Sequence, residues 1–297
     1  MDRDVPRVGL IGWPVGHSVS PAMHNAAFEA LGMTWKYELF PTPSDEIETR
    51  IDEIRAGKVT GANVTIPHKQ AVIPFLDKQL EAAAIVGAVN TIVVEDDSVV
   101  GYNTDVGGIL WALEQHDVSL ADSHVVMLGA GGAARATFYA LNRLGVTSID
   151  VFNRTPEHAG ALVVEFEPLL KTINLTAHPL GHQDCLAQSI KQAELLINTS
   201  SVGMHPNVTE SPLPAELALQ SDLVVFDMVF NPYETRLLRL AKASGAKTIV
   251  GLDMLVGQGV ESFQIWTGQT PPADVMKQAA LDVLNAHSPK ESEPDAQ

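Results

Sequence analysis

A lysine just beyond a short alternating segment is the first residue of this chain that can do chemistry. The segment 61–69 reads G-A-N-V-T-I-P-H-K. Its alternation predicts a strand with Asn63 and Thr65 on one face, opposite apolar residues such as Ile66. Lys69 can then share a pocket with this polar pair. A partly desolvated ammonium releases its proton more readily and can serve as a general acid or base, whereas a solvated surface lysine is the alternative.

Polar residues farther along the chain can complete such a pocket. Asn90 and the triplet N-T-D at 103–105 flank a predicted hairpin with the acidic turn 95–97. If Asp105 faces Lys69, its carboxylate holds the ammonium in place. The alternative is that Asp105 only caps the helix that follows.

Two serines precede the first predicted helix in the segment H-S-V-S-P at 17–21. Their hydroxyls, two residues apart beside a helix start, suit a carboxylate ligand. The alternative is that Ser20 caps the helix, with Pro21 at its first position, and that Ser18 is a loop residue.

A glycine-rich turn predicts a dinucleotide site. Gly129, Gly131 and Ala134 fit the pattern G-x-G-x-x-A between a buried strand at 124–128 and an alanine-rich helix. The next strand ends in Asn153-Arg154-Thr155, where an NAD site usually has an acidic residue. A guanidinium there favours the 2′-phosphate of NADP, and an ordinary surface arginine is the alternative.

Strand and helix signals alternate along the chain, which predicts an α/β fold with two domains. The strands expected in the first domain are 8–12, 35–39, 61–67, 91–94 and 98–101. Those expected in the second domain are 124–128, 148–152, 195–198, 223–227 and 247–250, and the second domain is expected to be Rossmann-like and doubly wound. A last helix, 273–286, is expected to return to the first domain because its apolar stripe needs a partner surface.

Composition limits the class of protein. The 297 residues carry a formal net charge of −17 and a single cysteine, Cys185, and no apolar run approaches the length of a membrane span. The acidic balance argues against nucleic acid or anionic membrane as a partner. The lone cysteine and the lack of a signal-peptide pattern predict a cytoplasmic protein. The histidines are not spaced as a zinc site, so no metal is expected, and the hydrolase signature G-x-S-x-G is absent.

Together the motifs resemble the shikimate dehydrogenase family from Val8 to about Leu284. The matching segments, in the family's order, are H-S-V-S-P-A-M-H-N, G-A-N-V-T-I-P-H-K, G-A-V-N-T, N-T-D, G-A-G-G-A, N-R-T, N-T-S-S-V-G-M, N-P-Y-E-T and G-L-D-M-L-V-G-Q-G. The resemblance implies NADPH-dependent reduction of 3-dehydroshikimate to shikimate, a step of aromatic amino acid biosynthesis. It also implies a substrate-binding and catalytic domain at 1–106, completed by helices in 253–287, and an NADP-binding domain at 107–252, separated by a cleft. The tail 288–297 is expected to be disordered.

The resemblance also implies a role for individual residues. Lys69 would be the acid/base and Asp105 its partner. The substrate carboxylate would bind Ser18 and Ser20, and the ring hydroxyls would bind Asn63, Thr65, Asn90, Asp105 and Gln258. The cofactor would be lined by Glu81, Gly129, Ala130, Gly131, Gly132, Ala133, Asn153, Arg154, Thr155, His158, Thr199, Ser200, Met228 and Gly251.

Two positions depart from the family's usual pattern. Phe230 stands where the family usually has a tyrosine that contacts substrate, which predicts weaker substrate binding through one missing hydrogen bond. His158 replaces an arginine found in many NADP-dependent members, which predicts a looser preference for NADP. Two alternatives remain open: a quinate/shikimate dehydrogenase that uses NAD, and a non-catalytic dinucleotide-binding protein. The sequence also leaves open whether the chain is a monomer or a homodimer.

Overall fold

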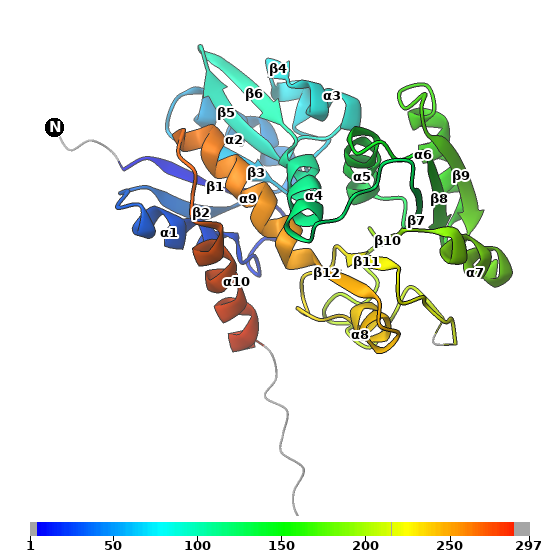
Figure 1. Cartoon of the computed structure of the whole chain (residues 1–297). Helices are drawn as coiled ribbons and strands as arrows, with labels where there is room; N and C mark the ends of the chain where they lie inside the picture. Colours follow the sequence, from blue (N-terminus) through cyan, green and yellow to red (C-terminus); the bar gives the residue numbers. More distant parts are fainter. Residues whose placement is uncertain (1–4, 215, 288–297) are drawn as a thin grey trace, which may run out of the picture.

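The computed structural model describes residues 5–214 and 216–287, so the predicted disordered tail 288–297 lies outside the described residues. Two six-stranded sheets, each covered by helices, form two α/β units (Figure 1). The α/β class and the two-domain organisation therefore agree with the prediction from the sequence.

The first sheet is mixed and has the strand order β2-β1-β3-β5-β6-β4. Its first three strands are parallel, whereas β5 runs antiparallel to both β3 and β6. Asp96 and Asp97, at the tip of the β5–β6 hairpin, have φ values of 47° and 61°. The strands are β1 (Arg7–Gly12), β2 (Lys36–Pro41), β3 (Gly61–Val64), β4 (Lys78–Gln79), β5 (Thr91–Glu95) and β6 (Ser98–Tyr102).

Strand β3 is shorter than the alternating pattern predicts. It ends at Val64, and all four of its residues are buried because β1 and β5 flank it and helices cover both faces of the sheet. The chain then turns, with the amide of His68 donating to the carbonyl of Thr65. The prediction that Thr65 and Ile66 continue the strand with opposite faces was wrong, because Ile66 follows the end of the strand and is 76% exposed.

The second sheet is parallel throughout, with the strand order β12-β11-β10-β7-β8-β9. The strands are β7 (His124–Leu128), β8 (Ser148–Asn153), β9 (Asn174–Pro179), β10 (Leu195–Asn198), β11 (Val224–Asp227) and β12 (Lys247–Val250). The sequence did not predict the edge strand β9 or the two-residue β4. Neither contains a fully buried residue, so neither carries the apolar run by which a strand is recognised.

Helices cover both faces of each sheet. On the first sheet, apolar residues of α1 and α10 pack on one face and those of α2 pack on the other. On the second sheet, α5 and α6 oppose α7 and α8. The helices are α1 (Ser20–Ala30), α2 (Ile47–Arg55), α3 (Glu81–Val86), α4 (Thr104–Gln115), α5 (Gly132–Arg143), α6 (Pro156–Phe166), α7 (Gln183–Gln192), α8 (Arg236–Ala243), α9 (Gly251–Thr267) and α10 (Ala273–His287), with short 3-10 turns η1 (Ser44–Glu46) and η2 (Ile73–Phe75).

Helices α4 and α9 connect the two units and pack against each other along their lengths (Figure 1). Helix α9 begins directly after β12 of the second sheet and ends in the core of the first, where Phe263 and Trp266 are buried. Burying a side chain of this size contributes about 2 to 3 kcal/mol, so α9 is anchored firmly in the first unit. Helix α10 then packs on α1, which confirms the predicted return of the chain to the first domain.

Candidate active site

The predicted catalytic and substrate residues lie at one edge of the first sheet. The carboxyl ends of β1, β3 and β6 meet there with the amino end of β5, since β5 is antiparallel to its neighbours. Ligands of α/β proteins commonly bind at such an edge because the loops that follow the strands converge there. Residues from distant segments are thereby brought together.

Lys69 and Asp105 form a direct ion pair. The Nζ atom of Lys69 lies 2.6 Å from Oδ2 of Asp105, and their side chains are 28% and 10% exposed. Asp105 lies in the first turn of α4, where the positive end of the helix dipole stabilises a carboxylate. Asn103 is the N-cap residue of that helix, so the alternative that Asp105 only caps it was wrong.

Asn90 supports the other oxygen of Asp105. Its Nδ2 donates to Asp105 Oδ1 over 2.9 Å and to the hydroxyl of Thr104, also over 2.9 Å. Its Oδ1 accepts the backbone N–H of Thr104 over 2.7 Å, which fixes the orientation of the amide. Asp105 is therefore held from two sides: one carboxylate oxygen pairs with the ammonium of Lys69 and the other accepts a hydrogen bond from the amide of Asn90.

Asn63 lies at the centre of a buried network that extends from β2 to α9. Its Oδ1 accepts from the hydroxyl of Tyr37 over 2.8 Å, and its Nδ2 donates to Thr91 and Ser262, each over 3.0 Å. Burial raises the pKa of Tyr37 far above its ordinary value, so this hydroxyl stays a donor. The sequence reasoning missed Tyr37 and Ser262. The only available signal was that each places a hydroxyl on an apolar face, where it requires a partner.

Ser18 and Ser20 are adjacent at the start of α1. Ser20 is buried and Ser18 is half-buried, and Ser18 Oγ accepts the backbone N–H of Ser20 over 3.2 Å. Val19 is the N-cap residue and makes no side-chain cap, so the alternative that Ser20 caps the helix was wrong. The hydroxyl of Ser20 remains close to Tyr37.

Thr65, Gln258 and Phe230 belong to three different parts of the chain. Thr65 is half-buried and packs over Gly12 at the end of β1. Gln258 is 8% exposed on α9, and its Nε2 donates to the carbonyl of Leu255 over 2.8 Å. Phe230 follows β11 of the second sheet yet packs against the apolar core of the first. It is therefore a side chain of one unit that contacts the other.

The predicted dinucleotide turn lies at the topological switch point of the second sheet. Strand β7 has β8 on one side and β10 on the other, so the direction of strand succession reverses at β7. Ligands of open α/β sheets commonly bind at the carboxyl ends of the strands at such a point. Gly129 follows β7 with φ of +107°, and a Cβ there would lie 2.9 Å from Thr199 Oγ1 and from the backbone N of Ser200. Glycine is thus required both by the backbone conformation and by the close approach.

The amino end of α5 fits the phosphates of a dinucleotide. A Cβ built on Gly131 or Gly132 would meet no atom within 4 Å, and Gly131, the N-cap residue, makes no side-chain cap. The space beside these two glycines is therefore open, and the N–H groups at the amino end of a helix bind phosphate. Ala130 and Ala133 in the same turn are half-buried and add no bulky side chain.

The remaining predicted cofactor residues lie on α3 and on the segments that follow β8, β11 and β12. Arg154, Thr155 and His158 are exposed at the end of β8, where Asn153 Nδ2 donates to the carbonyl of Thr155 over 2.8 Å. Glu81 begins α3 and faces the hydroxyl of Tyr139 on α5 over 3.4 Å. At the end of β11, the backbone of Met228 lies against Gly251, where a Cβ would come within 2.4 Å of the Met228 carbonyl oxygen.

The structure therefore gathers the predicted residues into two groups. Lys69, Asp105, Asn90 and Asn63 are joined by hydrogen bonds through the buried network, whereas the glycine turn and the loop after β8 form a separate region on the second sheet. Gln258 and Phe230 lie on segments between these groups. Within residues 5–214 and 216–287, no cluster of three or more His, Cys, Asp or Glu side chains is arranged to hold a metal ion. Within the same residues, no helix has the length and apolar character of a membrane span.

Comparison with known protein families covers most of the chain. Residues 10–92 match the model of the shikimate dehydrogenase substrate binding domain, residues 111–219 that of shikimate / quinate 5-dehydrogenase, and residues 251–281 that of the shikimate 5'-dehydrogenase C-terminal domain. A shikimate dehydrogenase (NADP(+)) of Methanothermobacter thermautotrophicus is 46% identical over 93% of this chain and 96% of its own.

Solved structures give the same result. A shikimate 5-dehydrogenase of Thermus thermophilus, in complex with NADP(H) and shikimate, has a TM-score of 0.83 and 38% identity, over 94% of this chain and 100% of its own. A quinate dehydrogenase of Corynebacterium glutamicum, in complex with NAD, has a TM-score of 0.86 and 31% identity over the same shares. The family models, the fold and the identity over nearly the whole chain agree, and this chain belongs to the shikimate dehydrogenase family.

Proposed function

We propose that this protein catalyses the reversible NADPH-dependent reduction of 3-dehydroshikimate to shikimate, in the cytoplasm, as a step of aromatic amino acid biosynthesis. The observation that carries the proposal is the pairing of Lys69 Nζ with Asp105 Oδ2 over 2.6 Å at the sheet edge where the other predicted substrate residues gather. Membership of the family supplies the reaction. The lone cysteine, Cys185, supports the compartment, since a reducing environment suits a chain that can form no internal disulfide.

Lys69 is the general acid and base of the proposed reaction. The nicotinamide of NADPH supplies a hydride to the ring carbonyl carbon. Lys69 donates a proton from Nζ to the carbonyl oxygen, which becomes the new hydroxyl, and it takes that proton back in the reverse direction. Its side chain is 28% exposed, so the ammonium is accessible to a ligand while still paired.

Asp105 and Asn90 position the lysine. The carboxylate of Asp105 restrains the flexible side chain of Lys69 by an ion pair, and the amide of Asn90 fixes the carboxylate. Restraining a catalytic group in this way lowers the entropic part of the barrier. The carboxylate of Asp105 can also accept a hydrogen bond from a substrate hydroxyl, as proposed for this position from the family.

The substrate is a hydroxylated ring with one carboxylate, and the surrounding side chains suit it. Ser18 and Ser20 offer two adjacent hydroxyl donors at the amino end of α1, which favours a negative group. Asn63, Thr65, Asn90 and Gln258 supply amides and a hydroxyl for the ring hydroxyls. Phe230, which packs against the apolar core of the first unit, offers no hydrogen bond to the substrate.

NADP(H) is the proposed cofactor, and the fit of the residues supports it. The open space beside Gly131 and Gly132 accommodates the pyrophosphate, and the exposed guanidinium of Arg154 can pair with the 2′-phosphate. A single arginine without a second basic partner at His158 predicts a preference for NADP over NAD that is moderate rather than strict.

The direct test measures initial rates with purified protein. Reduction of 3-dehydroshikimate with NADPH, and oxidation of shikimate with NADP+, should both proceed and both be faster than with NADH or NAD+. Faster turnover of quinate with NAD+ would instead establish the quinate/shikimate alternative. Binding of NADP+ with no turnover of either acid would establish the non-catalytic one. Sedimentation of the same sample distinguishes the monomer from the homodimer.

Replacing the lysine tests its role. Lys69→Ala should lower kcat by a factor of about 100 or more, because general acid–base catalysis typically contributes that much, while the affinity for NADP+ stays unchanged. Lys58→Ala is the matched control, since Lys58 is an exposed lysine in the same unit just before β3. Normal turnover by Lys69→Ala would rule out the acid/base role.

A further inference from the structure

A glutamate on α9 lies against α4, the helix that carries Asp105. Glu261 lies one turn beyond Gln258 and is half-buried between α9 and α4. A Cβ built on Gly107 of α4 would lie 1.7 Å from Glu261 Oε2. The carboxylate of Glu261 therefore fills the space that a side chain at position 107 would take, and it packs against the helix that carries Asp105.

The helices approach each other closely at this point because α4 has two consecutive glycines. A Cβ on Gly108 would lie 2.6 Å from the carbonyl oxygen of Met254 and 2.9 Å from the backbone N of Gln258. Glu261, Gln258 and the first turn of α4 thus form one tightly packed contact. Asp105 lies in that turn, two residues before Gly107.

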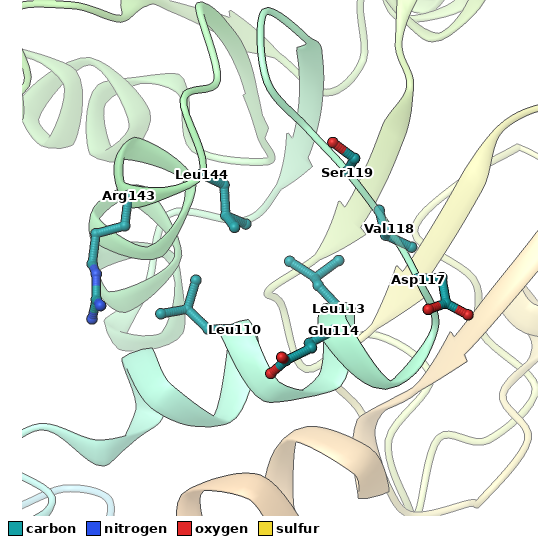
Figure 2. Close-up of a pocket in the computed structure, with 8 residues that line it drawn as sticks. All are labelled: Leu110, Leu113, Glu114, Asp117, Val118, Ser119, Arg143 and Leu144. Carbon is teal, nitrogen blue, oxygen red and sulfur yellow. The ribbon is translucent and has the colours of Figure 1, made fainter.

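The charges around Glu261 come from two other helices. Burial raises the pKa of Glu261 to about 7, the positive charge of Arg143 opposes this rise, and the negative charge of Asp105 adds to it. Arg143 is the last residue of α5. Its guanidinium lies beside Leu110 of α4, and both residues line a groove of about 490 Å³ (Figure 2). Leu110 is one helical turn from Gly107. Asp105 and Arg143 are therefore the charged groups whose fields act on Glu261 from α4 and α5.

Other titratable groups that contact α9 lie elsewhere. From α1, His24 faces Gly259, and complete burial lowers the pKa of His24 to about 3, which keeps it neutral. At the opposite end of α9, His116 and Lys277 both pair with Asp253. Asp253 is eight residues from Glu261, or about 12 Å along the helix axis.

We propose that Glu261 is a positioning residue whose charge acts on the Lys69–Asp105 pair and sets the pH range over which Lys69 gains and loses its proton. The inference rests on the proposed function, because it assumes that Lys69 is the acid/base. An ionised Glu261 adds a negative charge near the pair and stabilises the positively charged lysine. Oxidation of shikimate requires the neutral lysine. The ascending limb of the pH–rate curve therefore lies at higher pH with the ionised glutamate than it would without that charge.

The test compares pH profiles of kcat/KM for shikimate oxidation with NADP+ between pH 6 and 10. Glu261→Gln removes the charge and keeps the shape of the side chain. The ascending limb of its pH profile should lie about 0.5 pH unit below that of the wild type, which is the size expected for a charge in a partly solvated interior. Glu261→Asp keeps the charge and should restore most of the shift. Glu114→Gln removes an exposed charge from α4 and should leave the limb in place.

The position of the limb does not depend on how much active enzyme each preparation contains, so partial unfolding of a variant does not mimic the effect. A limb that coincides for wild type, Glu261→Gln and Glu114→Gln would overturn the inference, even if Glu261→Gln were less stable. An equal shift in both Gln variants would also overturn it, since net charge alone would then explain the effect. If the wild type oxidised no shikimate, the proposed function would fail instead.

Discussion

At the scale of single residues, a series of hydrogen bonds restrains Lys69, the proposed acid/base. Lys69 is held by Asp105, Asp105 by Asn90, and Asn90 by the backbone of Thr104. These bonds restrain the ammonium without burying it fully, since the side chain of Lys69 is 28% exposed. A lysine held in this way stays accessible to a ligand.

Phe230 provides a prediction at the same scale. Phe230→Tyr should lower the KM for shikimate several-fold with little change in kcat, because one added neutral hydrogen bond contributes about 1 kcal/mol. The measurement is steady-state kinetics at saturating NADP+. Phe75→Tyr, which adds a hydroxyl to a half-buried ring in η2, is the control and should leave KM unchanged. A KM for Phe230→Tyr that equals or exceeds that of the wild type would contradict the proposed contact.

At the scale of elements, the approach of α4 to α9 determines how the site is assembled. Helix α4 carries Asp105, and α9 carries Gln258 and the network residue Ser262. Gly107 and Gly108 remove the side chains that would separate the two helices. Because α9 is anchored by Phe263 and Trp266, a change in the helix spacing must displace α4 and the residues of its first turn.

Gly108→Ala tests this close contact. The added methyl would meet the backbone of Met254 and Gln258, and backbone cannot move aside as a side chain can, so we expect a loss of about 1 to 3 kcal/mol of unfolding free energy and a raised KM for shikimate. Gly160→Ala is the matched control, because Gly160 lies within α6 with no atom within 4 Å of an added Cβ. That variant should be as stable as the wild type or more so, since alanine favours helix. Equal stability of both variants in urea unfolding would show that the helices can separate at no cost.

At the scale of the whole molecule, Arg135 of the second unit forms a hydrogen bond to the first unit. Arg135 lies in the first turns of α5, beside the predicted pyrophosphate site, and its Nε donates to the carbonyl of Val86 at the end of α3 over 2.7 Å. The rest of its guanidinium pairs with Glu165 and lies over the ring of Phe166. Gly87, with φ of +65°, leaves room for it, since a Cβ there would lie 2.9 Å from Arg135 Nη2.

Arg135→Ala should therefore destabilise the molecule by about 1 to 3 kcal/mol, because it leaves the Val86 carbonyl without its donor. Arg7→Ala removes an exposed pair with Glu38 and should cost less than about 1 kcal/mol. Thermal unfolding of both variants at one pH measures the difference. A Tm for Arg135→Ala no lower than that for Arg7→Ala would show that this contact between the units contributes nothing.

The sequence by itself determined the α/β class, the family and most of the strands. It also determined the glycine turn that joins a strand to a helix within residues 124–143. These follow from local patterns: apolar periodicity, glycine where a turn needs it, and ordered motifs along the chain. The assignment of individual residues to substrate and cofactor stays a prediction. So do the domain boundaries, and the one at 106/107 falls within α4.

Only the tertiary structure decided where the carboxylate of Asp105 points, which N-cap possibilities were wrong, and that Tyr37 and Ser262 belong to the network around Asn63. The physical reason is distance along the chain. The Asn63–Ser262 hydrogen bond joins residues 199 apart, and the Lys69–Asp105 pair joins residues 36 apart. Such contacts depend on which faces α4, α9 and β3 bury together, and a local pattern of residue types shows that a face is buried without showing against what.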